Sequence, residues 1–330
     1  VGGWRALARH LRRSPKGYDF NGSWEPVDSL RVVQPSRWLP DVARPAFLGR
    51  WTNVARLKQV QQFMDEEYGC DKVVLDLWHP RFASALDLVD HKMSCYHIID
   101  EYSYSPKETP FSVAERQLVS SVDQVFITSR GLMDKKGQAN ANSFYAPNGV
   151  DFEAYSRAVP EPADLAAIPC PRIGYCGVIK TTLDWPLLDQ LSARHPDWHF
   201  VFVGGINPAH RDIVAPIEEL SRRHNVHFLG PKSVQELANY PQHFDVCTMP
   251  YRRRSHSWGY GYPLKLHEYL ASGRPTVGTP IVSLREFDSV IELATSTDEW
   301  SDAIQYCLSD EANNLAKVEV RRDVAKPVSY

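Results

Sequence analysis

Short apolar runs alternate with amphipathic segments through the second half of this chain, and that alternation restricts the fold more than any other feature. The expected strands are Ile173–Ile179, Trp198–Gly205, Val226–Gly230, Phe244–Pro250 and Pro275–Gly278. The expected helices are Leu183–Pro196, Ile213–His224, Ser233–Pro241 (with Ser233 and Glu236 as a capping box), one opened by Pro263, and one near Asp298–Leu308. Strands that alternate with helices predict a parallel sheet covered on both faces, and hence a doubly wound domain.

The first half is less regular but also predicts α/β structure. Its expected strands are Lys72–Pro80, Ser94–Tyr102 and Asp123–Ser129, with helices at Val54–Tyr68 and Val113–Ser121. Prolines gather between the halves, which is typical of an interdomain linker. At 330 residues the chain is long enough for two domains. We therefore expect an α/β protein with a first domain over 1–155, a linker over 156–170 and a second domain over 171–330.

Composition excludes several classes of function. The net charge of −3 provides no bulk attraction for nucleic acid, and no apolar run approaches the ~20 residues of a membrane span. The six cysteines form no CxxC pair, which favours buried reduced thiols and a cytoplasmic compartment. The twelve histidines include no set of two with a nearby carboxylate, so we expect no metal site.

The stretch YPLKLHEYLASGRPTVGTP, Tyr262–Pro280, is the most informative for function. Pro263 suits a helix start and Gly273 a left-handed helix end. Lys265 and Glu268 are three positions apart, so they share a face of the first turn, beside a helix N-terminus that suits a phosphate. Such a pair can hold a nucleotide, with the cation on phosphate and the carboxylate on ribose. The alternative is a surface Lys–Glu pair, and the helix alone does not decide between the two.

Residues that follow the expected strands are further candidates, because ligands of open parallel sheets bind beyond the carboxyl ends of the strands. Lys180 follows the first strand of the second half, where Gly174 and Gly177 keep the backbone slim enough for a diphosphate to approach. Gly204 ends the next strand. No GxGxxG fingerprint follows any strand, which argues against a dehydrogenase.

A basic loop and an aromatic loop precede the helix at Pro263. Arg252–Arg254 indicate an anionic pocket, although a solvated basic loop is the common alternative. The aromatic and glycine residues of Trp258–Tyr262 favour a shaped, mobile binding loop.

Strand ends of the first half carry the candidates for a general base. These are His79 and the acidic pair Asp100 and Glu101. A histidine that packs and an aspartate that caps a helix are the ordinary alternatives, and placement at a strand end is the only argument for catalysis.

Three segments resemble a known family. They are APNGVD at Ala146–Asp151, RIGYCGVI with LDW at Arg172–Trp185, and FDVCTMPY with PLKLHEYLASGRPTVGTP. In these the chain resembles nucleotide-sugar glycosyltransferases of the GT-B fold, specifically the retaining group of glycosyltransferase family 4 and its relatives. It is similar in particular to bacterial cell-surface polysaccharide transferases related to teichuronic acid glucuronosyltransferases, through IIDEYSY in the first half.

The resemblance implies two facing doubly wound, Rossmann-like domains and a nucleotide-sugar donor. It implies that Glu268 binds the ribose and that Lys180, with Arg252 or Lys265, binds the diphosphate. Cationic side chains and the helix dipole would neutralise the leaving diphosphate, so we expect no metal and no cofactor beyond a UDP-, GDP- or dTDP-sugar co-substrate. The remaining donor-binding candidates are Gly177, Gly204, Tyr260 and Leu264.

The chain departs from that family in two places. The family often has a second glutamate eight positions before the ribose-binding one, and this chain has Tyr260 there. The family usually opens with a strand and a glycine-rich loop, whereas this chain opens with a basic segment, so the N-terminal domain is expected to be truncated.

The expected function is transfer of a sugar from a nucleoside diphosphate to a glycan or lipid-linked acceptor in polysaccharide or cell-envelope biosynthesis. The stereochemistry is open, and an inverting enzyme would need Asp100, Glu101 or His79 as its base. A nucleotide-sugar epimerase and an inactive nucleotide-sugar-binding module are the alternatives. We expect a cytoplasmic protein, with Trp4 and Leu11 of the basic N-terminal segment either resting on the inner face of the membrane or covering the first domain.

Overall fold

The computed structural model describes residues 46–68, 73–102, 111–206, 211–252 and 258–329. The chain divides into two compact units, of which one holds 1–97 and 113–125 and the other 98–112 and 126–330. The predicted domain limits 1–155, 156–170 and 171–330 stay a prediction. The basic N-terminal segment and the arginines at 253 and 254 lie outside the described residues.

The first half forms a small parallel sheet. Its strands are β1 (Val74–Leu77), β2 (Met93–Ile98), β3 (Gln124–Ile127) and β4 (Ser143–Tyr145), in the order β1-β2-β3-β4. β1 runs parallel to β2. The helices of this part are α2 (Ala46–Tyr68), α3 (Ala85–Leu88), α4 (Val113–Ser121) and α5 (Arg130–Lys136).

The second half forms a six-stranded sheet in which every pairing is parallel. Its strands are β5 (Arg172–Cys176), β6 (His199–Val203), β7 (Val226–Phe228), β8 (Val246–Met249), β9 (Thr276–Gly278) and β10 (Glu292–Leu293). Their order is β10-β9-β8-β5-β6-β7, so the winding reverses between β5 and β8. That reversal is the point at which open α/β sheets bind ligands.

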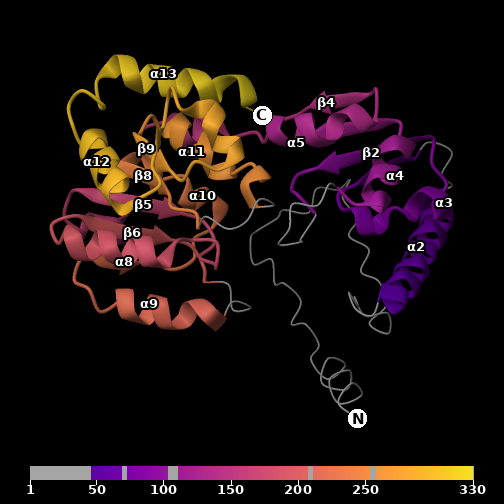
Figure 1. Ribbon diagram of the computed structural model, residues 1–330, viewed down its shortest axis with the longest axis horizontal. Helices are drawn as coiled ribbons and strands as arrows, with labels where there is room; N and C mark the ends of the chain where they lie inside the picture. Colours follow the sequence, from indigo (N-terminus) through magenta and orange to yellow (C-terminus); the bar gives the residue numbers. More distant parts are fainter. Residues whose placement is uncertain (1–45, 69–72, 103–110, 207–210, 253–257, 330) are drawn as a thin grey trace, which may run out of the picture. The chain divides into compact units, whose positions relative to one another are not determined.

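Helices accompany this sheet along the chain. They are α6 (Phe152–Ser156), α7 (Ala163–Ala166), α8 (Trp185–Arg194), α9 (Val214–Leu220), α10 (Val234–Leu237), α11 (Leu264–Ser272), α12 (Thr297–Cys307) and α13 (Leu315–Ala325). α13 packs against α11 (Figure 1). β5 runs through the centre of the sheet with all of its residues buried, which is the pattern of a strand covered on both faces.

The sequence predicts most of these elements, and the predicted doubly wound α/β fold is confirmed. The helix Val113–Ser121 matches residue for residue, and the capping box of Ser233 and Glu236 at α10 is present. The sequence does not predict the strands β4 and β10 or the helices α3, α5, α6, α7 and α13. These elements are short, or they lack a strong apolar period, so periodicity gives no clear signal for them.

One glycine assignment is wrong. Gly174 lies within β5, where an added Cβ would be 2.0 Å from the ring of Phe244. Its missing side chain therefore makes room for a core aromatic ring and not for a diphosphate.

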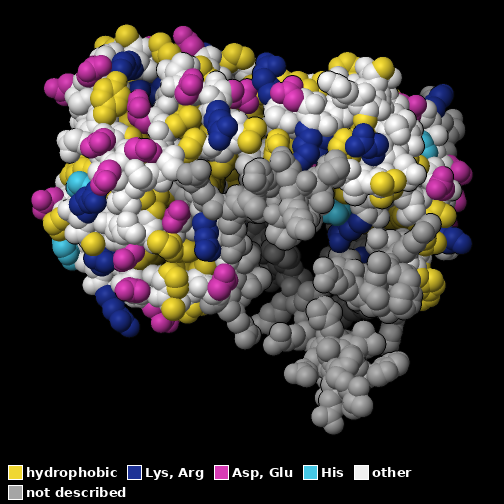
Figure 2. All heavy atoms as spheres, viewed as in Figure 1, with side chains coloured by type: hydrophobic (Ala, Val, Ile, Leu, Met, Phe, Trp, Pro, Cys, Tyr) yellow, Lys and Arg dark blue, Asp and Glu magenta, His cyan; other side chains and the backbone are white. Residues whose placement is uncertain are grey.

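Charges of both signs are interspersed over the face drawn in Figure 2. No described helix is long and apolar enough to cross a membrane. Within 46–68, 73–102, 111–206, 211–252 and 258–329, no group of three or more candidate metal ligands is present. His199 and His227 on neighbouring strands do share a hydrogen bond of 3.1 Å.

Candidate functional site

Helix α11 presents its N-terminus without a side-chain cap. Pro263 is the N-cap residue and makes no side-chain cap hydrogen bond, so the helix begins at Leu264, one residue later than predicted. Gly273 ends the helix in the left-handed conformation, with φ of 77°, as expected. The Leu266 amide donates a hydrogen bond of 3.1 Å to the Pro263 carbonyl. The amides of Leu264 and Lys265 are therefore the first-turn donors that can face a ligand at the positive end of the helix. Leu264 beside them is 58% exposed.

Two glycines bring the carboxyl ends of β5 and β6 together. Gly204 has φ of 150°, and a Cβ there would lie 2.1 Å from the carbonyl oxygen of Gly177. Gly177 has φ of 132°, and a Cβ there would lie 3.2 Å from both Cε and Nζ of Lys265. Backbone with such positive φ values is essentially restricted to glycine. The slim backbone predicted here therefore admits the Lys265 side chain directly.

Lys265 lies in an aromatic cage. Its Nζ donates a hydrogen bond of 3.4 Å to the hydroxyl of Tyr251 and lies 5.0 Å from the ring centroid of Tyr175. Burial favours the neutral amine, but the two phenols and the Glu268 carboxylate oppose it and raise the pKa of Lys265 above its ordinary value. Burial also raises the pKa of Tyr175 to about 12, so that phenol stays neutral at physiological pH. The cage therefore holds a protonated ammonium beside Gly177.

Lys180 provides a second cation close to the first. Burial and then the nearby Lys265 lower the pKa of Lys180, while Asp100 opposes that change. Two ammonium groups that repel each other at the carboxyl edge of a sheet are expected where an anion binds between or beside them. Lys180 and Lys265 come from segments far apart in the sequence, and the structure brings them together.

Glu268 lies one turn along α11 from Lys265. Burial raises the pKa of Glu268, while Lys265 and a side-chain hydrogen bond from Tyr155 oppose that rise. Tyr155 is buried in α6, which follows the APNGVD segment. A carboxylate held by a tyrosine and a lysine has a fixed direction, which suits hydrogen bonds to neighbouring ribose hydroxyls.

Asp100 adjoins this group of side chains. Its Oδ1 accepts a hydrogen bond of 2.8 Å from the Glu101 amide and would lie 3.4 Å from a Cβ added to Gly261. The side chain reaches solvent, yet the surrounding protein raises its pKa by desolvation, with Lys180 opposing. A carboxyl with a raised pKa near the Lys180 ammonium fits proton transfer, although its catalytic role stays a prediction.

Glu101 and His79 occupy structural positions. Burial of Glu101 would raise its pKa, but ion pairs to Lys135 at 2.7 Å and Lys136 at 3.0 Å outweigh it and lower the pKa. His79 caps the short 3-10 helix Pro80–Phe82, with Nδ1 accepting a hydrogen bond of 3.1 Å from the Arg81 amide. These contacts account for both side chains without catalysis, and their predicted role as bases stays untested.

Tyr260 packs its ring on α5. The Lys135 Nζ lies 4.7 Å from the ring centroid of Tyr260, and Ser129 donates a hydrogen bond of 3.0 Å to the Tyr260 carbonyl. Asn148 donates another of 2.9 Å to the Tyr262 carbonyl. The described part of the aromatic loop is thus tied down by hydrogen bonds and packing, whereas the sequence suggests a mobile loop.

Arg252 follows Tyr251 of the cage and has an exposed side chain. Its amide donates a hydrogen bond of 2.8 Å to the Thr182 carbonyl.

Sequence reasoning missed the tyrosines that position the two central charges. Tyr175 lies inside β5, Tyr251 follows β8, and Tyr155 lies in a five-residue helix. Tyrosines at such places are ordinary core residues. The one available signal was proximity to the predicted motifs, because each tyrosine is within five positions of a residue of APNGVD, IGYCGVI or FDVCTMP.

Comparison with protein families gives a match over the larger sheet. Residues 171–310 match the family model described as glycosyl transferases group 1. This region contains Gly177, Lys180, Gly204, Lys265 and Glu268.

Two curated proteins are similar in sequence. One is the TuaH protein of Bacillus subtilis, whose name describes it as a teichuronic acid biosynthesis glycosyltransferase. It is 30% identical to this chain over 224 residues, which are 64% of this chain and 55% of that protein. The D-inositol 3-phosphate glycosyltransferase of Corynebacterium aurimucosum is 23% identical over 279 residues, 77% of this chain and 64% of that protein. The chain thus spans just over half to about two thirds of the length of these relatives.

Solved structures share the fold at low identity. Sucrose-phosphate synthase from Thermosynechococcus elongatus has a TM-score of 0.67 at 16% identity, over 87% of this chain and 76% of that one. The UDP-GlcNAc 2-epimerase of Methanocaldococcus jannaschii, in complex with UDP-GlcNAc and UDP, has a TM-score of 0.50 at 10% identity. The match covers 84% of this chain and 81% of that chain. The chain therefore has the GT-B type of α/β fold, which glycosyltransferases and epimerases share.

Proposed function

We propose that the chain is a glycosyltransferase, because residues 171–310 match the family model described as glycosyl transferases group 1. The reaction proposed is transfer of a sugar from a nucleoside diphosphate donor to a glycan or lipid-linked acceptor. The observation that carries the proposal is the position of the Lys265 ammonium beside Gly177 at the N-terminus of α11, within electrostatic range of Lys180.

The donor is proposed to lie with its diphosphate at the two lysines and its ribose at Glu268. The first-turn N–H groups of α11 and the ammonium groups stabilise the charge that develops on the leaving diphosphate. Because these cations are held in place before the donor binds, no reorganisation is needed at the moment of bond cleavage. The same cations are the basis for proposing that the reaction proceeds without a metal ion.

Asp100 is proposed to face the acceptor hydroxyl. If the enzyme inverts, its carboxylate takes the hydroxyl proton, and the raised pKa favours that step. If the enzyme retains, the leaving phosphate takes the proton and Asp100 orients the acceptor. The anomer of the product separates these two mechanisms.

The acceptor is proposed to be a cell-envelope polysaccharide or its lipid-linked precursor. The support is the 30% identity to TuaH, whose name refers to teichuronic acid biosynthesis. A nucleotide-sugar donor and such an acceptor meet in the cytoplasm, including at the inner face of the membrane.

A thermal-shift screen with UDP-, GDP- and dTDP-sugars tests the donor site. We expect one nucleotide series to stabilise the chain, with the stabilisation lost in Lys265→Met and Glu268→Ala. The exposed residue Arg222, which lies after α9, supplies the control variant Arg222→Gln. Stabilisation by none of the nucleotides in an otherwise folded chain would overturn the proposal.

An epimerase is the second candidate, because UDP-GlcNAc 2-epimerase shares the fold. It would convert the sugar nucleotide without an acceptor, whereas a transferase releases nucleoside diphosphate faster when acceptor is present. An inactive binding module would bind the nucleotide and do neither. Product analysis by NMR with and without acceptor therefore separates the three.

A further inference from the structure

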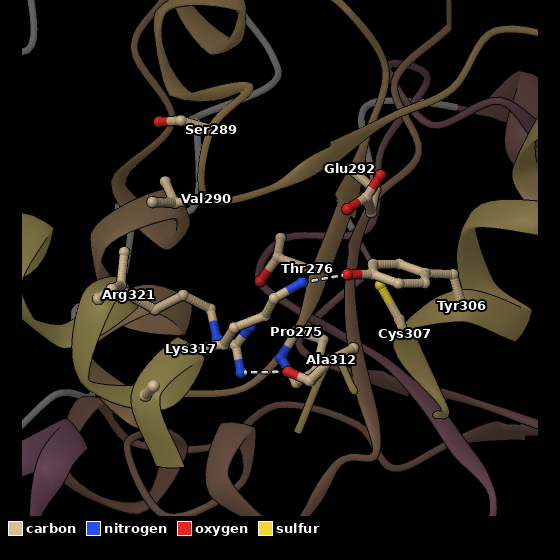
Figure 3. A pocket seen from close by; sticks show the side chains of 12 residues that line it. Pro275, Thr276, Ser289, Val290, Glu292, Tyr306, Cys307, Ala312, Lys317 and Arg321 are labelled. Carbon is tan, nitrogen blue, oxygen red and sulfur yellow. Dashed lines mark hydrogen bonds between the residues drawn. The ribbon is translucent and has the colours of Figure 1, made fainter. Parts of the chain in front are cut away.

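Two pockets lie in the second half of the chain, and neither is lined by the lysines of the donor site. They differ in whether the cationic side chains in their walls have hydrogen-bond acceptors. The first has a volume of about 280 Å³ and includes Lys317 and Arg321 in its wall (Figure 3). Lys317 donates to the Tyr306 hydroxyl, and Arg321 donates to the carbonyls of Gly273 and Ala312. Glu292 also lines this pocket, so it offers no excess of donors.

Several hydrogen-bond donors line the second pocket, and none of its described lining residues is a carboxylate. Its volume is about 310 Å³, well above the roughly 10–15 Å³ that one water needs. It forms where the C-terminal end of α11 meets α13 and the segment after α6. The lining residues are Ser156, Ala158, Gln242, Ser272, Gly273, Arg274, Asn313, Val318 and Arg322.

Two buried donors of this pocket have no partner among the described residues. They are the Nε of Arg322 and the Nε2 of Gln242. Arg322 pairs only through NH1, with the exposed Glu319 at 3.2 Å, and its guanidinium lies over Gly273, where a Cβ would be 3.1 Å from Nε. A buried donor without an acceptor is destabilising, so a pair of them in one pocket requires an explanation.

Arg274 adds a second guanidinium to the same wall. Its Nε donates a hydrogen bond of 2.8 Å to the backbone carbonyl of Gln242, which holds the Arg274 side chain beside the Gln242 backbone. Arginines near a helix C-terminus commonly complement the helix dipole. That role leaves the buried Nε of Arg322 and amide of Gln242 unexplained, because neither donates to a carbonyl of α11.

We propose that this pocket binds a small oxyanion, namely a phosphate group. Two guanidinium groups and an amide, with no acidic side chain in the lining, match the planar donor arrangement that recognises phosphate oxygens. The phosphate accepts the hydrogen bonds that Arg322 Nε and Gln242 Nε2 otherwise lack. The proposal is independent of nucleotide-sugar binding, because it involves none of the residues at the N-terminus of α11.

Isothermal titration calorimetry with sodium phosphate at constant ionic strength tests the proposal on the full chain. We expect Arg322→Gln to weaken phosphate binding by about tenfold or more, since hydrogen bonds to charged groups contribute about 1.5–3 kcal/mol. Arg322→Lys keeps the charge but removes the buried Nε, so we expect weaker binding there too. Arg222→Gln makes the same charge change elsewhere and is expected to leave binding unchanged.

Gln242→Glu tests the pocket with a variant that is not expected to destabilise the fold. The new carboxylate would lie beside Arg274 and Arg322 and replace the anion, so the melting temperature is expected to rise while the response to phosphate disappears. Circular dichroism verifies that each variant is folded.

Lys180→Met separates this pocket from the donor site. Phosphate binding that survives Lys180→Met but not Arg322→Gln supports the proposal. Binding lost in Lys180→Met but kept in Arg322→Gln and Gln242→Glu would assign the phosphate to the donor site and overturn it, as would the absence of any binding. Glycerol 3-phosphate in parallel distinguishes the two sources of the group, because tighter binding than inorganic phosphate indicates an organic phosphate ligand.

Discussion

The two parallel sheets of this chain follow the same pattern of strand and helix, but their strand ends carry different kinds of residues. After β5 and β6 in the large sheet come glycines with positive φ and a lysine that meets a second lysine. After β1 and β2 in the small sheet come a histidine that caps a short helix and a glutamate in a buried ion pair. We therefore infer that a polar residue at a strand end is a candidate for function where its neighbours leave its charge unsatisfied.

Removal of the Glu101 carboxylate is expected to have the largest effect on stability. The side chains of Glu101 and Lys136 are fully buried, so Glu101→Gln leaves a buried ammonium without its carboxylate. We expect a loss of about 3–5 kcal/mol in the free energy of unfolding, measured by urea denaturation. Glu286→Gln, whose partner Arg130 is 68% exposed, is the matched control and should cost no more than about 1 kcal/mol. Equal losses in both variants would contradict a structural role for Glu101.

Lys265→Met tests the opposite case in the large sheet. Methionine keeps most of the volume in the cage of Tyr175 and Tyr251 but removes the charge. We expect kcat to fall by about 10²–10³, as for loss of one preorganised donor to a developing anion. Steady-state kinetics with the stabilising nucleotide-sugar measures this, and an unchanged kcat would remove Lys265 from the leaving-group site.

Gly204→Ala tests whether the close approach of β5 and β6 is required. The new Cβ would lie 2.1 Å from the Gly177 carbonyl oxygen, in a backbone conformation that costs about 1–3 kcal/mol for a non-glycine residue. We expect a drop in melting temperature together with weaker nucleotide binding. Gly230 also has a positive φ, of 73°, but a Cβ added there would have no heavy atom within 4 Å. Gly230→Ala should therefore cost only the conformational strain of about 1–2 kcal/mol and leave nucleotide binding intact.

The pH dependence of nucleotide binding sharpens the role of Glu268. Its pKa is raised above the ordinary value of 4.5, so the folded chain holds this proton more tightly than the unfolded chain. The contribution of Glu268 to stability therefore decreases as the pH rises from 4.5 through the folded pKa. Ribose binding by the carboxylate increases over the same window, by about tenfold for each pH unit below the folded pKa. Titration calorimetry of the nucleotide across this window measures the effect, and Glu268→Gln should abolish it.

His79→Ala carries the smallest expected effect. Loss of the cap at the 3-10 helix should cost about 0.5–1 kcal/mol and leave kcat unchanged. A fall in kcat without a fall in stability would restore His79 as a base candidate.

Most of the large sheet could be predicted from sequence because its strands are buried on both faces and its helices are amphipathic. The apolar runs at β5, β6 and β8 and the helix around Glu268 fall within a few residues of their predicted bounds. β10, with two residues, lacks the length that a periodic signal needs. α13 has a weakly amphipathic sequence and is held by packing on α11, which only the folded chain provides.

The sequence by itself determined the α/β class and the α11 helix with its Lys265 and Glu268. These follow from local chemistry, that is, from apolar period, helix ends and the residue types that suit a phosphate. The tertiary structure decided which charges meet. It brought Lys180 near Lys265 and Tyr155 to Glu268, and it paired Glu101 with two lysines. It also left the buried Nε of Arg322 and Nε2 of Gln242 without a partner among the described residues. Electrostatic and hydrogen-bond interactions depend on distance in space, and distances between residues far apart in the sequence are set only when the chain folds.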